Sequence, residues 1–127
     1  MIDHVTLRVS DFAASEAFYT CVLAPLGYEP YRDEQVPFTE WGDFSIAADD
    51  KPIAQNVHIA FAAKSREEVD AFHRAAIEAG YRDNGPPGER PIYHEGYYAA
   101  FVLDPDGNNV EAVFHDRQPG PRLRLRA

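Results

Sequence analysis

The sequence repeats itself at an offset of 54 residues. At this offset the segment His4–Val9 falls on His58–Ala63, and the Ala-Phe pair at residue 17 recurs at residue 71. A Gly-Tyr pair at residue 27 recurs at an offset of 53. Two copies of one supersecondary unit explain these matches better than unrelated segments do. The chain is therefore expected to fold as two similar halves.

The first half begins with a strand and a helix. Residues 3–9 carry an apolar side chain at every second position, as a half-buried strand does. Ser10 or Asp11 can cap the helix that follows, and Gly27 ends that segment. The second half has the same order, because His58–Ala63 also alternates and a capping box follows at Ser65-Arg-Glu-Glu.

Three strand-like stretches follow the helix in each half. They cover residues 28–31, 36–41 and 44–48 in the first half and residues 81–83, 97–103 and 109–115 in the second. Residues 84–95 contain three prolines and two glycines, which predicts a loop. The turn Asp104-Pro-Asp-Gly predicts that the last two strands form an antiparallel hairpin. The expected fold class is thus α+β, with two βαβββ modules at about residues 1–50 and 54–116.

Length and charge limit the function classes. A chain of 127 residues corresponds to one domain, here residues 1–116, followed by a basic tail at 117–127 that holds four arginines and no acid. The rest of the chain has 8 basic against 21 acidic residues, a balance that disfavours binding to nucleic acid. No segment is apolar over a membrane-spanning length, and no targeting signal is recognised, so a cytoplasmic location is expected.

The alternation of the strands predicts which side chains share a surface. If Val5, Leu7 and Val9 pack on a helix, then His4 points to the opposite face, and the same holds for His58. In the last strand, packing of the apolar residues 110, 112 and 114 turns Glu111 to that face. Two imidazoles and one carboxylate on rigid strands suit a divalent metal ion that keeps open positions.

Several motifs resemble the vicinal oxygen chelate superfamily, which includes glyoxalase I, bleomycin-resistance proteins, extradiol dioxygenases and fosfomycin-resistance thiol transferases. The resemblance covers residues 1 to about 116. It lies in the opening His4-Val-Thr-Leu-Arg-Val-Ser-Asp, in Ala-Phe-Tyr at residue 17, in Gly27-Tyr28, in His58 and, most specifically, in Asp104-Pro-Asp-Gly-Asn-Asn-Val-Glu111.

The resemblance implies a U-shaped half-barrel cavity with the helices outside and a metal ion at its base. Substrates would chelate the ion through adjacent oxygens, and the protein would be a homodimer. The implied metal ligands are His4, His58 and Glu111. Zinc, iron, manganese and nickel are all compatible with this set.

One position departs from glyoxalase I, which has a glutamate on the last strand of its first module. Here that strand is Asp43-Phe-Ser-Ile-Ala-Ala, and the expected register places Ser45 opposite Glu111. We expect Asp43 or Glu40 to substitute only after a register shift that turns the other faces over. A three-ligand site is closer to the dioxygenases and thiol transferases.

Candidates for proton transfer lie near the mouth of the expected cavity. They are Tyr97, Tyr98 and His94, and alternation allows only one of the two tyrosines to face inward. The expected substrate pocket is formed by Thr6, Arg8, Ala60, Ala62 and His115.

Two functions are consistent with these residues. The first is a metal-dependent enzyme with lyase or isomerase, dioxygenase or thiol transferase chemistry. The second is a binding protein of the bleomycin-resistance type that sequesters a small molecule without catalysis. The presence of all three metal ligands favours the enzyme.

Overall fold

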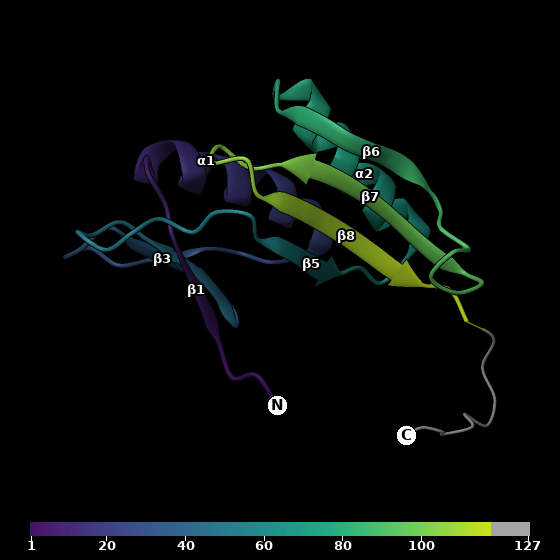
Figure 1. Ribbon diagram of the computed structural model, residues 1–127, viewed down its shortest axis with the longest axis horizontal. Helices are drawn as coiled ribbons and strands as arrows, with labels where there is room; N and C mark the ends of the chain where they lie inside the picture. The colour runs from purple at the N-terminus through teal and green to yellow at the C-terminus, as the bar shows by residue number, and fades with distance from the viewer. Residues whose placement is uncertain (118–127) are drawn as a thin grey trace.

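The computed structural model of the protein describes residues 1–117 and shows an α+β fold of two similar modules (Figure 1). Each module has one helix and a four-stranded sheet, as the internal repeat predicts. The two helices contact each other where the modules meet. Residues 118–127 of the predicted basic tail lie outside the described residues.

The first module comprises β1 (Val5–Arg8), α1 (Phe12–Leu23), a 3₁₀ turn (Ala24–Leu26), β2 (Tyr31–Arg32), β3 (Phe38–Trp41) and β4 (Phe44–Ala47). Its strand order is β1-β4-β3-β2, with β1 parallel to β4 and the other pairs antiparallel. The helix therefore connects two strands that do not pair with each other, and β1 is left at an edge of the sheet.

The second module repeats this arrangement. It comprises β5 (His58–Ala62), α2 (Arg66–Glu78), β6 (Arg82–Glu89), β7 (Tyr97–Leu103) and β8 (Asn109–His115). Its strand order is β5-β8-β7-β6, with β5 parallel to β8 and at the edge of its sheet. The matching topologies confirm that the two halves are copies of one βαβββ unit.

Side chains cap both helices at their first turn. Asp11, rather than Ser10, caps α1, because its carboxylate accepts a hydrogen bond from the amide of Ala14 at 3.0 Å. Ser65 caps α2 by accepting from the amide of Glu68 at 3.1 Å. The Glu68 carboxylate in turn accepts from the amide of Lys64, which closes the capping box one residue earlier than usual.

The core lies between each sheet and its helix. Its fully buried members include Phe18 and Val22 of α1 and Val69 and Phe72 of α2. Phe44 of β4 meets Phe61 of β5 edge to face, with ring centroids 5.0 Å apart, and so joins the two modules. Neither helix in the described part of the chain is long and apolar enough to cross a membrane.

The prediction of a loop over residues 84–95 was wrong in its first half. Strand β6 runs from Arg82 to Glu89 and pairs with β7 through register shifts at Asp83/Gly85 and Gly85/Gly88. Prolines are accommodated here because β6 is an edge strand with bulges, where a missing backbone donor costs little. Strand β2 is also shorter and later than expected, since it holds only Tyr31 and Arg32.

The turn between β7 and β8 ties the second module to the first. The buried Asp104 carboxylate accepts from the amides of Asp106 and Asn108, both at 2.9 Å, and from the hydroxyl of Tyr19 on α1 at 2.6 Å. Burial of Tyr19, together with the charge of Asp104, raises the pKa of this hydroxyl far above its ordinary value. The hydroxyl therefore stays protonated and donates to Asp104.

We predict that Tyr19→Phe lowers the free energy of unfolding by about 1.5–3 kcal/mol, because it leaves a buried carboxylate short of one donor. Urea denaturation measures the change. The control is Tyr28→Phe, since the partly exposed Tyr28 hydroxyl donates only a 3.4 Å bond to the carbonyl of Ala62. Equal losses in the two variants would contradict the role assigned to Asp104.

Candidate functional site

The register of strands β5, β7 and β8 places the candidate site residues of the second module on the sheet face away from α2. Glu111 of β8 pairs with Ala60 of β5 and with Phe101 of β7, so these three side chains share one face. The neighbouring residues Val110 and Ala112 point the other way and are fully buried in the core. The predicted strand phase around Glu111 is confirmed.

The Glu111 carboxylate lies at the centre of this face. It is 1% exposed, and its Oε1 atom is 2.7 Å from Nε2 of His58. Its Oε2 atom accepts a hydrogen bond from the hydroxyl of Tyr97. Within residues 1–117, no lysine or arginine forms an ion pair with Glu111. A buried carboxylate thus has only an imidazole and a phenol as polar partners.

Tyr97 is the tyrosine that faces this site. Its burial, its hydrogen bond to Glu111 and the negative charge of that carboxylate all raise the pKa of the Tyr97 hydroxyl, in that order of size. The hydroxyl is therefore a proton donor near neutral pH. It fixes one oxygen of Glu111 and leaves the other directed at His58.

Tyr98 lies on the opposite face of β7 and does not belong to the site. Its hydroxyl donates to Asp70 of α2 at 2.6 Å, and the guanidinium of Arg66 stacks over its ring at 4.6 Å from the centroid. The inclusion of Tyr98 among the candidate catalytic residues was therefore wrong. Alternation excludes it, because Tyr97 already faces Glu111.

His94 and His115 lie together at the rim of the site. Nε2 of His94 is 2.9 Å from Nδ1 of His115, and both rings pack edge-on against Tyr97. Burial of His115 lowers the pKa of its imidazole, and the nearby His94 and Arg117 lower it further. These two histidines pack against the Tyr97 ring, and in the described residues neither forms a hydrogen bond with Glu111.

His4 precedes β1 in the first module. Its Nδ1 atom is 2.8 Å from a carboxylate oxygen of Asp3, and its Nε2 atom has no hydrogen-bond partner among residues 1–117. It borders a cavity of about 360 Å³ together with Thr6, Glu40 and Ser45. The cavity is formed by first-module residues alone, so His4 does not lie beside His58 in the same chain.

The registers of the two sheets show which positions correspond. Val5 pairs with Phe44 as Ile59 pairs with Val110, so Ser45 is the counterpart of Glu111, as predicted. Glu40 of β3 pairs with Ser45 and borders the same cavity. The expectation that Glu40 would need a register shift was wrong, because antiparallel partners already share a face.

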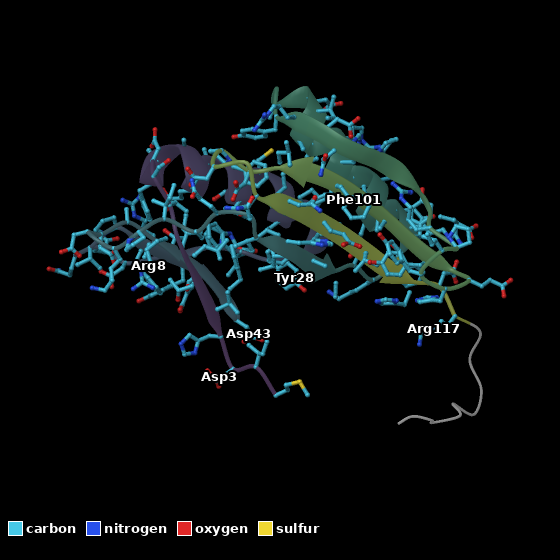
Figure 2. All side chains as sticks on the ribbon, in the orientation of Figure 1. Asp3, Arg8, Tyr28, Asp43, Phe101 and Arg117 are labelled. Atoms are coloured by element: carbon cyan, nitrogen blue, oxygen red, sulfur yellow. The ribbon has the colours of Figure 1, made fainter. Side chains whose placement is uncertain are left out.

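Within residues 1–117, no group of three or more His, Cys, Asp or Glu side chains is arranged to hold a metal ion. His58 and Glu111 are together, and His4 is separate. Figure 2 shows this separation, since Asp3, the partner of His4, lies well away from Phe101, whose ring centroid is 6.1 Å from that of His58. The three-ligand metal site therefore remains a prediction, because residues 1–117 of a single chain do not bring His4, His58 and Glu111 together.

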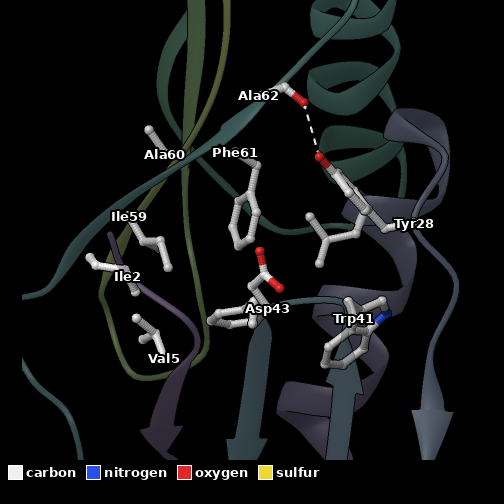
Figure 3. Close-up of a pocket in the computed structure, with 11 residues that line it drawn as sticks. Ile2, Val5, Tyr28, Trp41, Asp43, Ile59, Ala60, Phe61 and Ala62 are labelled. Atoms are coloured by element: carbon white, nitrogen blue, oxygen red, sulfur yellow. Dashed lines mark hydrogen bonds between the residues drawn. The ribbon is translucent and has the colours of Figure 1, made fainter.

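The remaining predicted pocket residues are divided between the modules. The Thr6 hydroxyl is 2.8 Å from that of Ser45, and Arg8 donates from Nε to Asp49 at 3.2 Å. Ala60 and Ala62 are exposed on the edge strand β5. They border a second cavity of about 290 Å³ between the modules, shown in Figure 3 with Asp43 beneath the ring of Phe61.

Sequence reasoning missed one residue beside a predicted ligand and assigned another to the wrong face. Asp3 binds the Nδ1 atom of His4, and an acidic residue next to a candidate histidine ligand was the available signal. Glu40 was placed out of phase because the pairing of β3 with β4 was not worked out from the sequence.

The family model of the Glyoxalase/Bleomycin resistance protein/Dioxygenase superfamily matches residues 1–112. The chain belongs to this superfamily. It is also 30% identical over 122 residues to the uncharacterized protein YqjT of Bacillus subtilis (strain 168), a match that covers 87% of this chain and 95% of that protein.

Two solved structures illustrate the likeness. A glyoxalase/bleomycin resistance protein from Albidiferax ferrireducens T118 superposes with a TM-score of 0.75 at 32% identity, covering 88% of this chain and 97% of that one. A lactoylglutathione lyase from Agrobacterium tumefaciens shares the fold, with a TM-score of 0.64 at 23% identity. The match covers 90% of this chain and 92% of that one. The resemblance inferred from the motifs is therefore confirmed.

The lowered pKa of His115 predicts a pH dependence of stability. As the pH falls below about 6.5, the unfolded chain binds a proton at this position more readily than the folded chain, so the free energy of unfolding decreases. Urea denaturation at about pH 7.5 and pH 5.5 measures this loss. The loss should be smaller in His115→Gln. An equal loss in that variant would exclude His115 as its source.

Proposed function

We propose that this protein is a metal-dependent enzyme that holds a small substrate through two adjacent oxygens. The observation that carries the proposal is the buried Glu111 carboxylate, which faces Nε2 of His58 and has no lysine or arginine partner within residues 1–117. His58 and Glu111 would hold a divalent ion, whose charge would compensate that of the carboxylate.

The cost of burying a carboxylate supports this reading. A buried charge is unfavourable unless it is paired or coordinates a metal, and within residues 1–117 the nitrogen group in contact with Glu111 is the largely exposed imidazole of His58. The carboxylate oxygen and the imidazole nitrogen are also the donor types that zinc, iron, manganese and nickel accept. The chemistry of the donor set therefore fits a divalent transition metal.

We further propose that His4 of a second copy completes the site. In the described part of the chain, His4 has no partner at Nε2 and its Nδ1 atom contacts Asp3, which is the arrangement of a metal ligand oriented by a carboxylate. Strands β1 and β5 each have only one neighbouring strand in the described part of the chain. Unpaired edges of this kind are available for association, so a homodimer can bring the two modules of different chains together.

The residues of the chain would then have distinct roles. His58, Glu111 and the second copy's His4 hold the ion, which when bound supplies a Lewis acid for the two substrate oxygens. Tyr97 orients Glu111 through its hydroxyl and remains protonated. Ala60 and Ala62, which carry small side chains beside His58, leave space for the substrate.

Metal analysis of the protein purified without chelator tests the proposal. We expect close to one ion per chain in the wild type and a loss of at least about tenfold in affinity for His58→Ala, Glu111→Gln and His4→Ala. His73→Ala is the control, because His73 lies on α2 and contacts Asp83 on the helical face. Metal-free wild type with an intact small-molecule affinity would instead favour a binding protein without catalysis.

Mixing two inactive variants tests whether the site lies between chains. When His4→Ala and Glu111→Gln are unfolded and refolded together, about half of the dimers are mixed, and each mixed dimer has one intact site. Metal binding should therefore return to about a quarter of the wild-type stoichiometry, measured by calorimetry. No recovery beyond the separate variants would show that the site is not shared.

A further inference from the structure

The guanidinium of Arg90 lies on the same sheet face as the candidate site. On this face Phe101 of β7 pairs with Gly85 of β6. Further along the two strands, Ala99 pairs with Gly88. Strand β6 therefore contributes no side chain at either position. The side chain of Arg90, the residue that follows β6, occupies the space instead, with its Cζ atom 5.3 Å from the centroid of the Phe101 ring.

The two glycines leave room for this guanidinium. A Cβ atom on Gly88 would lie 3.1 Å from Nη1 of Arg90. A Cβ atom on Gly85 would lie 3.3 Å from Nη2 of Arg90 and 2.9 Å from Cδ1 of Phe101. Gly85 also has a φ of +149°, which residues with a Cβ rarely adopt. The bulged backbone of β6 is therefore shaped to hold the arginine against Phe101.

Hydrogen bonds connect Arg90 to the candidate site. Its amide donates to the carbonyl of Tyr97 at 2.7 Å, and the hydroxyl of Tyr97 donates to Glu111. In the side chain, Nη2 donates to the carbonyl of Pro86 at 2.8 Å. A guanidinium has five N–H donors, and among residues 1–117 this carbonyl is the acceptor that the structure provides for it. Most of its donors are thus available to a ligand.

The charge of Arg90 is not balanced by a neighbouring acid in the described part of the chain, where no Asp or Glu forms an ion pair with it. Glu89 is adjacent in sequence, but it pairs with Tyr98 on the opposite face of the sheet and binds Arg66 at 3.4 Å. The half-buried guanidinium therefore presents an uncompensated positive charge to the site face.

We propose that Arg90 binds a carboxylate of the substrate. The substrate class is then a small acid that carries this carboxylate in addition to the two adjacent oxygens. A planar guanidinium matches a carboxylate in geometry, and its single positive charge matches the single negative charge. The role of the two adjacent oxygens rests on the proposed metal-dependent function, whereas the anion site at Arg90 does not.

The spacing of the strands indicates the length of such an acid. Phe101 lies beside Glu111 in the sheet, and Gly85 lies one strand further away. Neighbouring strands are about 4.8 Å apart, so a guanidinium over these two residues lies roughly 5–10 Å from Glu111 across the sheet. A short carbon chain between the adjacent oxygens and the carboxylate would bridge this distance and contact the Phe101 ring.

Two related keto acids test the assignment. α-Ketoglutarate and α-ketovalerate have the same pair of adjacent oxygens, but only α-ketoglutarate has a second carboxylate. In calorimetric titrations of the full-length protein loaded with Mn²⁺, we expect the wild type to bind α-ketoglutarate at least about tenfold more tightly. Arg90→Met should abolish this preference and leave the affinity for α-ketovalerate unchanged. Arg90→Lys, which keeps the charge without the planar fork, should retain part of the preference.

Arg74→Gln is the matched control. It removes one positive charge from the exposed surface of α2, on the other side of the sheet, and should keep the wild-type preference. An equal loss of preference in Arg74→Gln would show that the total charge of the protein attracts the acid, and the assignment of Arg90 would be wrong.

A measurement on the metal-free wild type tests the anion site separately from the proposed function. Glutarate has two carboxylates and no keto oxygen, and the Nε–H signals of the arginines are followed by NMR as it is added. We expect the Arg90 signal to shift and to saturate at a lower glutarate concentration than the signal of Arg74. Equal responses of the two signals would overturn the anion site. Because this titration needs no variant, it decides the matter if Arg90→Met fails to fold.

The outcomes distinguish the two proposals. Equal wild-type affinities for the two keto acids, or an unchanged preference in Arg90→Met, would overturn the role of Arg90 and leave the metal site intact. A wild-type protein that binds no Mn²⁺ would overturn the proposed function, and the glutarate titration would then decide the anion site by itself.

Discussion

The position of the Glu111 carboxylate depends on the alternation of strand β8. Val110 and Ala112 are fully buried beneath the helices, and this burial forces Glu111 onto the other face, where His58 and Tyr97 meet it. The apolar contacts of the core thus fix a charged group in a place where it is nearly inaccessible to water. A shift of β8 by one residue would exchange the two faces and remove the site.

The same strand pair connects the site to the rest of the molecule. The turn that leads into β8 is held by Asp104, whose carboxylate also binds Tyr19 of the first module. The orientation of Glu111 and the attachment of one module to the other therefore originate in neighbouring residues. The Asp104-Pro-Asp-Gly segment thus serves both the hairpin and the contact between modules.

The alternating strands and the capping residues allowed much of this fold to be predicted. The phase of β5 and β8, the antiparallel hairpin and the correspondence of Ser45 with Glu111 all follow from local pattern. Strand β6 did not, because its prolines are tolerated only at a bulged edge, and edge position is a property of the sheet. Tyr98 and Glu40 were assigned incorrectly for a related reason, since their faces depend on which strands pair.

The sequence by itself determined that two βαβββ units exist and that His58 and Glu111 both point away from the helices, because these facts depend on the repeat and on the apolar periodicity within each strand. The tertiary structure decided that His4 stands apart from them within a chain and that Glu40 lies beside Ser45. These facts depend on how separate strands pair and how the modules are placed, and the spacing of residues along the chain carries no record of either.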